Sequence, residues 1–189
     1  MKLFTRKYLS TLVLIVLLGI LFFSPNAKAY VLKALLSTGI FNADTKKNNK
    51  VIDHMPFAQL AFTDKNAAPL NTADLKGKII LVNFWATWCP PCIAEMGSLN
   101  TLYNKLKADP RFVFIMADAD GNLPLSDAFM QKRGYSLPVY QIAGPVPADL
   151  FAGTLPTTLI IDAKGNLVQK HEGIANYDTP EMLAFLKSL

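Results

Sequence analysis

The chain has 189 residues, 51% of which are hydrophobic, and its formal net charge is +5. This length is sufficient for one domain with its own core together with further segments. Most of the excess charge lies at the start, because residues 30–189 contain 15 basic and 14 acidic side chains and residues 56–189 contain 11 and 12. A nucleic-acid-binding domain is therefore excluded, since it would carry a basic surplus.

Residues 1–29 have the composition of a signal peptide or a membrane anchor. Three basic residues precede an almost wholly apolar run at 8–23, a combination that directs a chain into a membrane. Small residues at Ala27 and Ala29 make cleavage before Tyr30 one outcome. An uncleaved anchor is the other, because the run is long for a signal core and its flanks could extend it towards the roughly 20 residues that span a bilayer.

Both outcomes predict the same location for the rest of the chain. Positive charge before the apolar run keeps the N-terminus in the cytoplasm and sends the C-terminal part across the membrane. We therefore expect an extracytoplasmic protein, in the periplasm or on the outer face of the cytoplasmic membrane, where disulfides persist. If the leader is not removed, its helix holds the protein in the membrane. A lipoprotein is excluded, because no cysteine lies near this segment to carry a lipid.

Residues 30–54 are expected to connect this leader to a folded domain at 55–189. Apolar side chains recur at helical spacing within 30–41, so this amphipathic segment either lies in the membrane interface or packs on the domain. The stretch 42–53 is rich in Lys and Asn and is predicted to be a tether. His54, at its end, is interpreted as a solvated side chain and not as a ligand.

The folded domain is predicted to alternate strands and helices. Strands are expected at 57–62, 79–85, 112–119, 139–142, 159–161 and 167–171, and helices or helical turns at 72–75, 91–107, 125–133, 147–151 and 179–189. The strand at 79–85 is apolar on both faces, as expected of a central strand that helices cover.

The only two cysteines, Cys89 and Cys92, lie where the strand 79–85 passes into the helix 91–107. A helix N-terminus favours a thiolate at Cys89, because unpaired backbone N–H groups and the positive end of the helix dipole stabilise negative charge there. Cys92 follows one turn later, close enough to attack a mixed disulfide and release the product. This arrangement predicts thiol-disulfide chemistry that needs both thiols.

Metal binding and haem attachment fit the sequence poorly. A zinc site would need two further Cys or His ligands, and His54 and His171 do not form a ligand pair. A c-type haem attachment would need His directly after Cys92, where Ile93 stands. We therefore expect no metal and no cofactor other than a redox-active disulfide between Cys89 and Cys92.

Glu95 is a further candidate for the chemistry. In the predicted helix it shares a face with Cys92 and Leu99, so burial should raise the pKa of its carboxyl and let it exchange protons with Cys92. The alternative is a glutamate that only complements the helix dipole. Pro90 and Pro91 lack N–H groups, which predicts a less stabilised Cys89 thiolate and favours a reductant.

Three stretches carry a resemblance to a known family. These are Asn83-Phe-Trp-Ala-Thr-Trp-Cys-Pro-Pro-Cys92, Glu95, and Leu155-Pro156-Thr-Thr before a strand. With them the chain resembles the thioredoxin fold and, more closely, the TlpA/ResA-like thiol-disulfide oxidoreductases. The resemblance implies an α/β domain at 55–189 in which helices flank a central mixed sheet, preceded here by the N-terminal hydrophobic helix and tether.

The resemblance also implies roles for individual residues. Cys89 would attack the substrate, Cys92 would resolve the mixed disulfide, and Glu95 would be the buried acid. Leu155 and Pro156 would form a cis peptide bond beside the disulfide, and Leu155 would offer backbone groups to an extended substrate. We also expect substrate contacts from Trp88, Pro90 and Pro91.

Two positions depart from related patterns. Cytoplasmic thioredoxins typically carry an aspartate where Asn83 stands, and Glu95 would take over its handling of protons. Many relatives have a proline five residues after the second cysteine, where this chain has Gly97.

Three functions remain open from the sequence. The first is an exported or membrane-anchored oxidoreductase that reduces protein disulfides with electrons from a membrane donor. The second is an oxidant or isomerase that uses the same cysteines. The third, of another class, is a docking module for apocytochrome c during its maturation.

Overall fold

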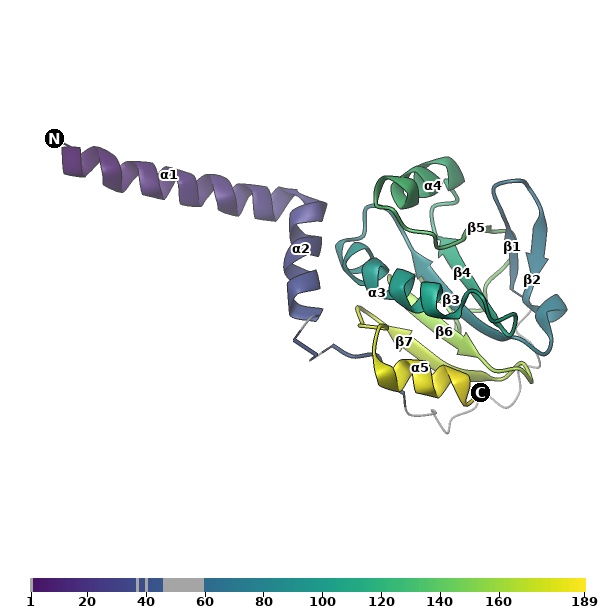
Figure 1. Ribbon diagram of the computed structural model, residues 1–189. Helices are drawn as coiled ribbons and strands as arrows, with labels where there is room; N and C mark the ends of the chain where they lie inside the picture. Colours follow the sequence, from purple (N-terminus) through teal and green to yellow (C-terminus); the bar gives the residue numbers. More distant parts are fainter. Residues whose placement is uncertain (1, 37, 40, 46–59) are drawn as a thin grey trace.

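The computed structural model describes residues 2–36, 38–39, 41–45 and 60–189 (Figure 1). In chain order its elements are α1 (Lys2–Phe23), α2 (Pro25–Leu36), β1 (Ala61–Thr63), β2 (Pro69–Asn71), the 3-10 helix η1 (Thr72–Leu75), β3 (Ile79–Trp85), α3 (Pro90–Leu106), β4 (Phe112–Asp118), α4 (Leu123–Lys132), β5 (Val139–Ile142), β6 (Thr157–Ile161), β7 (Leu167–Glu172) and α5 (Pro180–Lys187).

Among the described residues, seven strands form one sheet in the order β2-β1-β5-β4-β3-β6-β7. β3 pairs in parallel with β4, and β4 with β5, whereas the other pairs are antiparallel. The expected mixed sheet flanked by helices is therefore confirmed. The register pairs Trp85 with Asp118, so β3 and β4 end together and the loops after them emerge at the same edge of the sheet.

The side chains of β3 alternate between two apolar layers, as the period of a strand requires. Ile79, Leu81 and Trp85 lie in the layer that includes residues of α3 and α5, and both helices lie on the same side of the sheet (Figure 1). Ile80, Val82 and Phe84 belong to the other layer. All seven side chains of β3 are buried, which explains the continuous apolar run in its sequence.

Residues 143–154 cover the second face of the sheet. Leu150 is buried there, and the ring of Phe151 stacks on Phe84 with centroids 4.3 Å apart. We expected a helical turn at 147–151, and the structure has a hydrogen-bonded turn without a helix. The Pro-rich connection is thus part of the core.

Most of the predicted elements of the domain are present, with bounds that shift by a few residues. α4 begins at Leu123, two residues early, because the Asn122 side chain caps it by accepting from the N–H of Leu125. Thr179 caps α5 as expected, accepting from the N–H of Met182 at 3.1 Å. The short strand β2 was not predicted.

The N-terminal part consists of two helices that meet at a sharp bend. α1 extends away from the domain and α2 lies beside it (Figure 1). Among the described residues, no single helix is both long and apolar enough to cross a membrane. Taken together, the helical stretches 11–20 and 25–36 have the length and composition of a membrane span, but they are bent by 89° relative to each other.

α2 packs against α3, the helix that carries the cysteines. Its buried residues Ala29 and Leu36 lie in one cluster with Ile93 and Ala94 of α3. Of the two placements expected for the amphipathic segment, the described residues thus show the one on the domain, with a helix that begins at Pro25 and not at Tyr30. The predicted tether lies largely, and His54 wholly, outside the described residues.

Candidate active site

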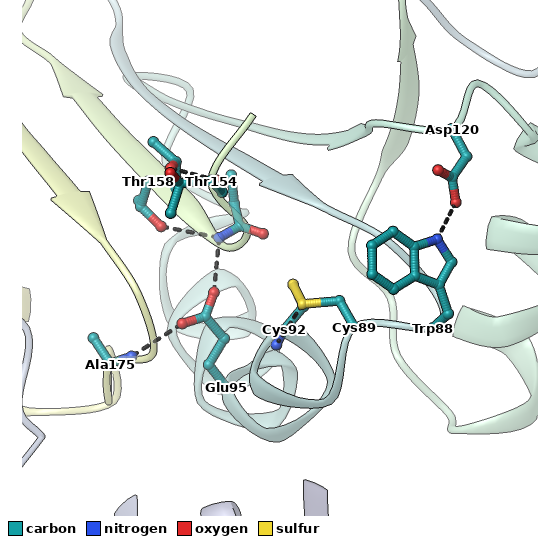
Figure 2. Close-up of a disulfide and its surroundings, with 10 residues drawn as sticks. Trp88, Cys89, Cys92, Glu95, Asp120, Thr154, Thr158 and Ala175 are labelled. Atoms are coloured by element: carbon teal, nitrogen blue, oxygen red, sulfur yellow. Dashed lines mark hydrogen bonds between the residues drawn. A yellow bond between two sulfur atoms is a disulfide. The ribbon is translucent and has the colours of Figure 1, made fainter. Parts of the chain in front are cut away.

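The two cysteines form a disulfide at the N-terminus of α3 (Figure 2). Cys89 is the N-cap residue, Pro90 and Pro91 fill the first two positions of the helix, and the N–H of Cys92 donates to Cys89 Sγ at 3.4 Å. Cys92 is 0% exposed and Cys89 retains 3%. An incoming thiolate therefore reaches Cys89 first, whereas Cys92 faces the protein interior.

Glu95 lies one helical turn after Cys92 and is 0% exposed. Its Oε1 accepts a hydrogen bond from Asn83 Nδ2 at 2.9 Å and its Oε2 accepts one from the backbone N–H of Ala175 at 3.0 Å (Figure 2). Burial raises the pKa of this carboxyl to about 8, because desolvation outweighs the two donors that favour its charged form. The expected buried acid with a raised pKa is thus present.

Asn83 connects Glu95 to two hydroxyl groups. Its Nδ2 also donates to Thr158 Oγ1 at 2.9 Å, and the Tyr177 hydroxyl donates to the same oxygen at 2.7 Å. Burial and the negative charge of Glu95 raise the pKa of Tyr177 well above its usual value. Tyr177 therefore stays protonated and Glu95 is the group of this network that titrates near neutral pH.

Trp88 borders the disulfide on its exposed side. The side chain is 58% exposed, and its Nε1–H donates to Asp120 Oδ2 at 2.6 Å (Figure 2). Asp120 belongs to the loop after β4, which ends level with β3. This hydrogen bond favours one orientation of the indole, most of which is exposed to solvent.

The Leu155–Pro156 peptide bond is cis, as the resemblance implied. Pro156 is buried and its carbonyl accepts from the N–H of Gly173 at 2.8 Å. Leu155 is half-buried and contacts both apolar layers. The bond directly precedes β6, which pairs with β3 and brings Thr158 opposite Asn83.

A family model described as Redoxin matches residues 50–186 of the chain. The chain belongs to the Redoxin family. This Redoxin protein is 35% identical to the thiol-disulfide oxidoreductase ResA of Bacillus thuringiensis over 129 residues, which cover 67% of this chain and 72% of the relative. It is also 30% identical to ResA of Oceanobacillus iheyensis over 141 residues, 73% of either chain.

Solved structures are similar to the same part of this Redoxin protein. One is a thiol:disulfide interchange protein of the thioredoxin family from Chlorobium tepidum TLS, with 28% identity, a TM-score of 0.56, and coverage of 71% of this chain and 99% of that one. Another is the exposed lipoprotein thioredoxin Etrx1 of Streptococcus pneumoniae, with 25% identity, a TM-score of 0.55, and coverage of 70% and 100%.

These similarities confirm the thioredoxin fold and the resemblance to TlpA/ResA-like proteins, and they make this Redoxin protein a thiol-disulfide oxidoreductase. Its redox centre is the Cys89–Cys92 disulfide. Within the described residues, no group of three or more His, Cys, Asp or Glu side chains lies close enough to hold a metal ion.

The structure places Cys89, Pro90, Pro91, Cys92 and Glu95 at the N-terminal end of α3, with Trp88 just before it, and it places Leu155 and Pro156 directly before β6, the strand that pairs with β3. It adds four residues that the sequence analysis did not single out. These are Asp120, Thr158, Ala175 and Tyr177. Asp120 could have been found, because acidic residues after a strand beside the redox strand lie at the same sheet edge. Ala175 and Tyr177 lie in a loop without periodicity, and no sequence pattern indicates them.

Proposed function

We propose that this protein is an exported, membrane-anchored oxidoreductase that reduces disulfides of other extracytoplasmic proteins through a Cys89/Cys92 dithiol cycle. The observation that carries the proposal is the buried Glu95 carboxyl behind Cys92, with a pKa of about 8. A general acid or base works best when its pKa lies near the ambient pH. A glutamate that only complemented the helix dipole would not need this burial.

The first step is nucleophilic attack by the reduced protein on its substrate. The Cys89 thiolate attacks one sulfur of a substrate disulfide, forming a mixed disulfide and releasing the other substrate sulfur as a thiolate. The position of Cys89 as the N-cap of α3, and its residual exposure, support its role as the attacking residue.

The second step releases the substrate. Cys92 gives its proton to the Glu95 carboxylate and attacks Cys89 Sγ, which forms the Cys89–Cys92 disulfide and expels the second substrate thiolate. The substrate gains two electrons and the protein loses two. Because Cys92 is fully buried, a proton acceptor inside the protein is needed, and Glu95 is one turn away on the same helix.

The direction of electron flow is inferred from the residues between the cysteines. Pro90 and Pro91 occupy the positions whose N–H groups would otherwise point towards Cys89, so the N–H of Cys92 is the first that α3 offers. A thiolate with fewer donors is less stabilised, and the dithiol gives up its electrons more readily. This supports a reductant over an oxidant or isomerase.

Substrate recognition is assigned to the surface around the disulfide. Trp88, Pro90 and Pro91 flank Cys89, and the Leu155–Pro156 peptide would pair its backbone groups with an extended substrate segment. The proposed substrates include apocytochrome c, whose cysteine pair forms a disulfide of the required kind. Electrons would return to the Cys89–Cys92 disulfide from a dithiol donor in the membrane.

The location is supported by the N-terminal helix. Large apolar side chains of α1 such as Leu12, Ile15 and Leu18 are more than half exposed, and a bilayer would bury them. With Lys2, Arg6 and Lys7 at the start of α1, before its apolar run, the domain would lie on the outer side.

The direct test is a trap for the partner. A full-length Cys92→Ser chain, expressed in its native cell, should accumulate mixed disulfides through Cys89 that a Cys89→Ser control lacks. Two results together would contradict the proposed reductase activity: neither variant yields a mixed disulfide, and the wild-type chain fails to turn over a model disulfide. They would favour the docking module. A reduction potential as high as those of strong oxidants would reverse the proposed direction.

A further inference from the structure

The N-terminal segment meets the loop that holds Glu95. The N–H of Asn176 donates to Phe41 O at 2.7 Å, and the N–H of Ala43 donates to Asn176 O at 3.1 Å. Together they form a parallel bridge between Asn42 and Asn176. Both backbone groups of Asn176 are therefore occupied by a segment more than 130 residues earlier in the chain.

The residue next to Asn176 is the donor to the carboxylate. Ala175 N–H points at Glu95 Oε2, and on the other side the N–H of Tyr177 donates to Ser98 Oγ of α3 at 3.2 Å. The loop is thus fixed to α3 at Tyr177 and to the N-terminal segment at Asn176. Ala175 lies beside these two attachments and is 0% exposed.

Two further contacts keep the segment in place. Ala43 is 6% exposed and belongs to the same core cluster as Cys92 and Tyr177. Asp44 O accepts a hydrogen bond from Gln169 Nε2 of β7. The segment 41–44 is therefore attached to the domain by its backbone, one side chain in the core and a side chain of the sheet.

We propose that residues Phe41–Ala43 are a positioning segment of the redox site, which holds the Ala175 N–H on the Glu95 carboxylate by pairing with Asn176. The inference rests on the proposed function at one point, namely that Glu95 is the proton acceptor of Cys92. It assigns to the part of the chain between the anchor and the domain a role in the chemistry, in addition to that of a connection.

The consequence for Glu95 has a definite sign. An N–H donor stabilises the charged carboxylate, so its loss favours the neutral acid and raises the pKa of Glu95. The titratable group linked to Glu95 is Tyr177, which reaches it through Thr158 of β6 and the neutral amide of Asn83 on β3. Cys92 on α3 is held in the disulfide of the oxidised chain and does not titrate there. Tyr177 is also attached to α3 through Ser98 Oγ, by a hydrogen bond that does not involve the segment 41–44.

The test uses the oxidised full-length chain in detergent micelles and needs no substrate. Ala43→Pro removes the N–H that donates to Asn176, whereas the matched control Ala43→Gly retains it. Hydrogen exchange at the Asn176 and Ala175 amides reports whether the bridge and the Glu95 bond persist. The carboxyl ¹³C resonance of Glu95, followed across pH, gives the midpoint of its titration.

We expect the Asn176 and Ala175 amides to exchange at least about tenfold faster in Ala43→Pro, and the Glu95 midpoint to rise. Ala43→Gly should stay close to wild type. If the Asn176 amide exchanges fast while the Ala175 amide and the Glu95 midpoint remain at their wild-type values, the inference is overturned.

A second variant covers the case in which Ala43→Pro does not fold. Gln169→Met removes the donor to Asp44 O and keeps a side chain of similar length. It should move both readouts in the same direction by a smaller amount, and a faster Asn176 amide without a change at Glu95 would again overturn the inference. The expected changes in amide exchange and in the Glu95 midpoint could be found while the wild-type chain fails to reduce a disulfide. That result would contradict the proposed function and leave the inference intact.

Discussion

Asn83 Nδ2 donates to Glu95 Oε1 at 2.9 Å inside the core, at the centre of the strand that leads to the cysteines. Both residues are 0% exposed. Asn83 Oδ1 has no hydrogen-bond partner among the described residues, so it is an acceptor that a protonated Glu95 could use after rotation of the amide. A neutral amide at this place supports the carboxylate without adding a second negative charge.

Replacement of Asn83 by Leu should raise the pKa of Glu95 further. The substitution removes a donor that favours the charged carboxylate and keeps the number and branching of the side-chain heavy atoms. The carboxyl titration of Glu95 measures this directly. Thr158→Val is the matched control, because Thr158 contacts Asn83 and not Glu95, and it should move the midpoint less. A midpoint that falls in Asn83→Leu would contradict the assigned hydrogen bond.

The raised pKa of Glu95 predicts that stability falls as pH rises from 4.5 to about 8. The folded-state value of about 8 exceeds the reference value of 4.5, so the folded chain binds a proton that the unfolded chain releases between these values. The resulting stabilisation is complete below pH 4.5 and is lost as pH rises through 8. The effect is on the order of 5 kcal/mol at most.

Glu95→Gln isolates this contribution. Urea unfolding of the oxidised protein at several pH values should show that wild type loses stability across the window between the two pKa values and that Glu95→Gln loses less. Other titrating groups are common to both proteins and cancel in the difference. A constant difference across the window would mean that Glu95 is ionised in the folded protein throughout.

Asp120 should affect substrate binding more than the chemical steps. Asp120→Ala removes the acceptor of the Trp88 indole N–H, which frees the ring and costs about 1 kcal/mol of binding. We expect KM for a protein disulfide to rise roughly fivefold with kcat nearly unchanged, and Trp88 fluorescence to change. Asp120→Asn, which keeps an oxygen acceptor, should lie closer to wild type. An unchanged KM in Asp120→Ala would show that the orientation of Trp88 does not contribute to substrate binding.

Phe151→Ala should destabilise the domain without altering the redox site. The ring of Phe151 stacks on Phe84 and covers the face of the sheet opposite α3, so its loss should cost about 2 kcal/mol for a half-buried aromatic side chain. Denaturant unfolding measures the change, and turnover of a model disulfide at low temperature serves as the control. Exposed Leu125→Ala, on α4, should cost little in comparison.

The sequence was informative wherever the pattern is local. The apolar run at 79–85 predicted β3 with its observed bounds, and Glu95 could be placed behind Cys92 because helical spacing alone puts them on one face. The hydrogen-bond donors to Glu95 could not be predicted in this way. Ala175 is an apolar residue in an irregular loop, and it contributes a backbone N–H whose position depends on the fold of a segment 80 residues away.

The N-terminal segment shows the same limit. The polar composition of 42–53 predicts a tether, whereas Phe41 and Ala43 pair with Asn176 through backbone atoms. Backbone pairing of a single bridge leaves no alternation of side chains to detect. β2 escaped prediction for a related reason, since it is three residues long and begins with Pro69.

The pH dependence of disulfide reduction, compared between wild type and Glu95→Gln, tests the central claim most directly. The full-length wild-type chain should reduce a model protein disulfide with a rate that rises through a midpoint near pH 8, as Glu95 becomes able to accept the proton of Cys92. Glu95→Gln should be slower and lack that midpoint, while Cys89→Ser should be inactive. An identical pH profile in wild type and Glu95→Gln would contradict the account.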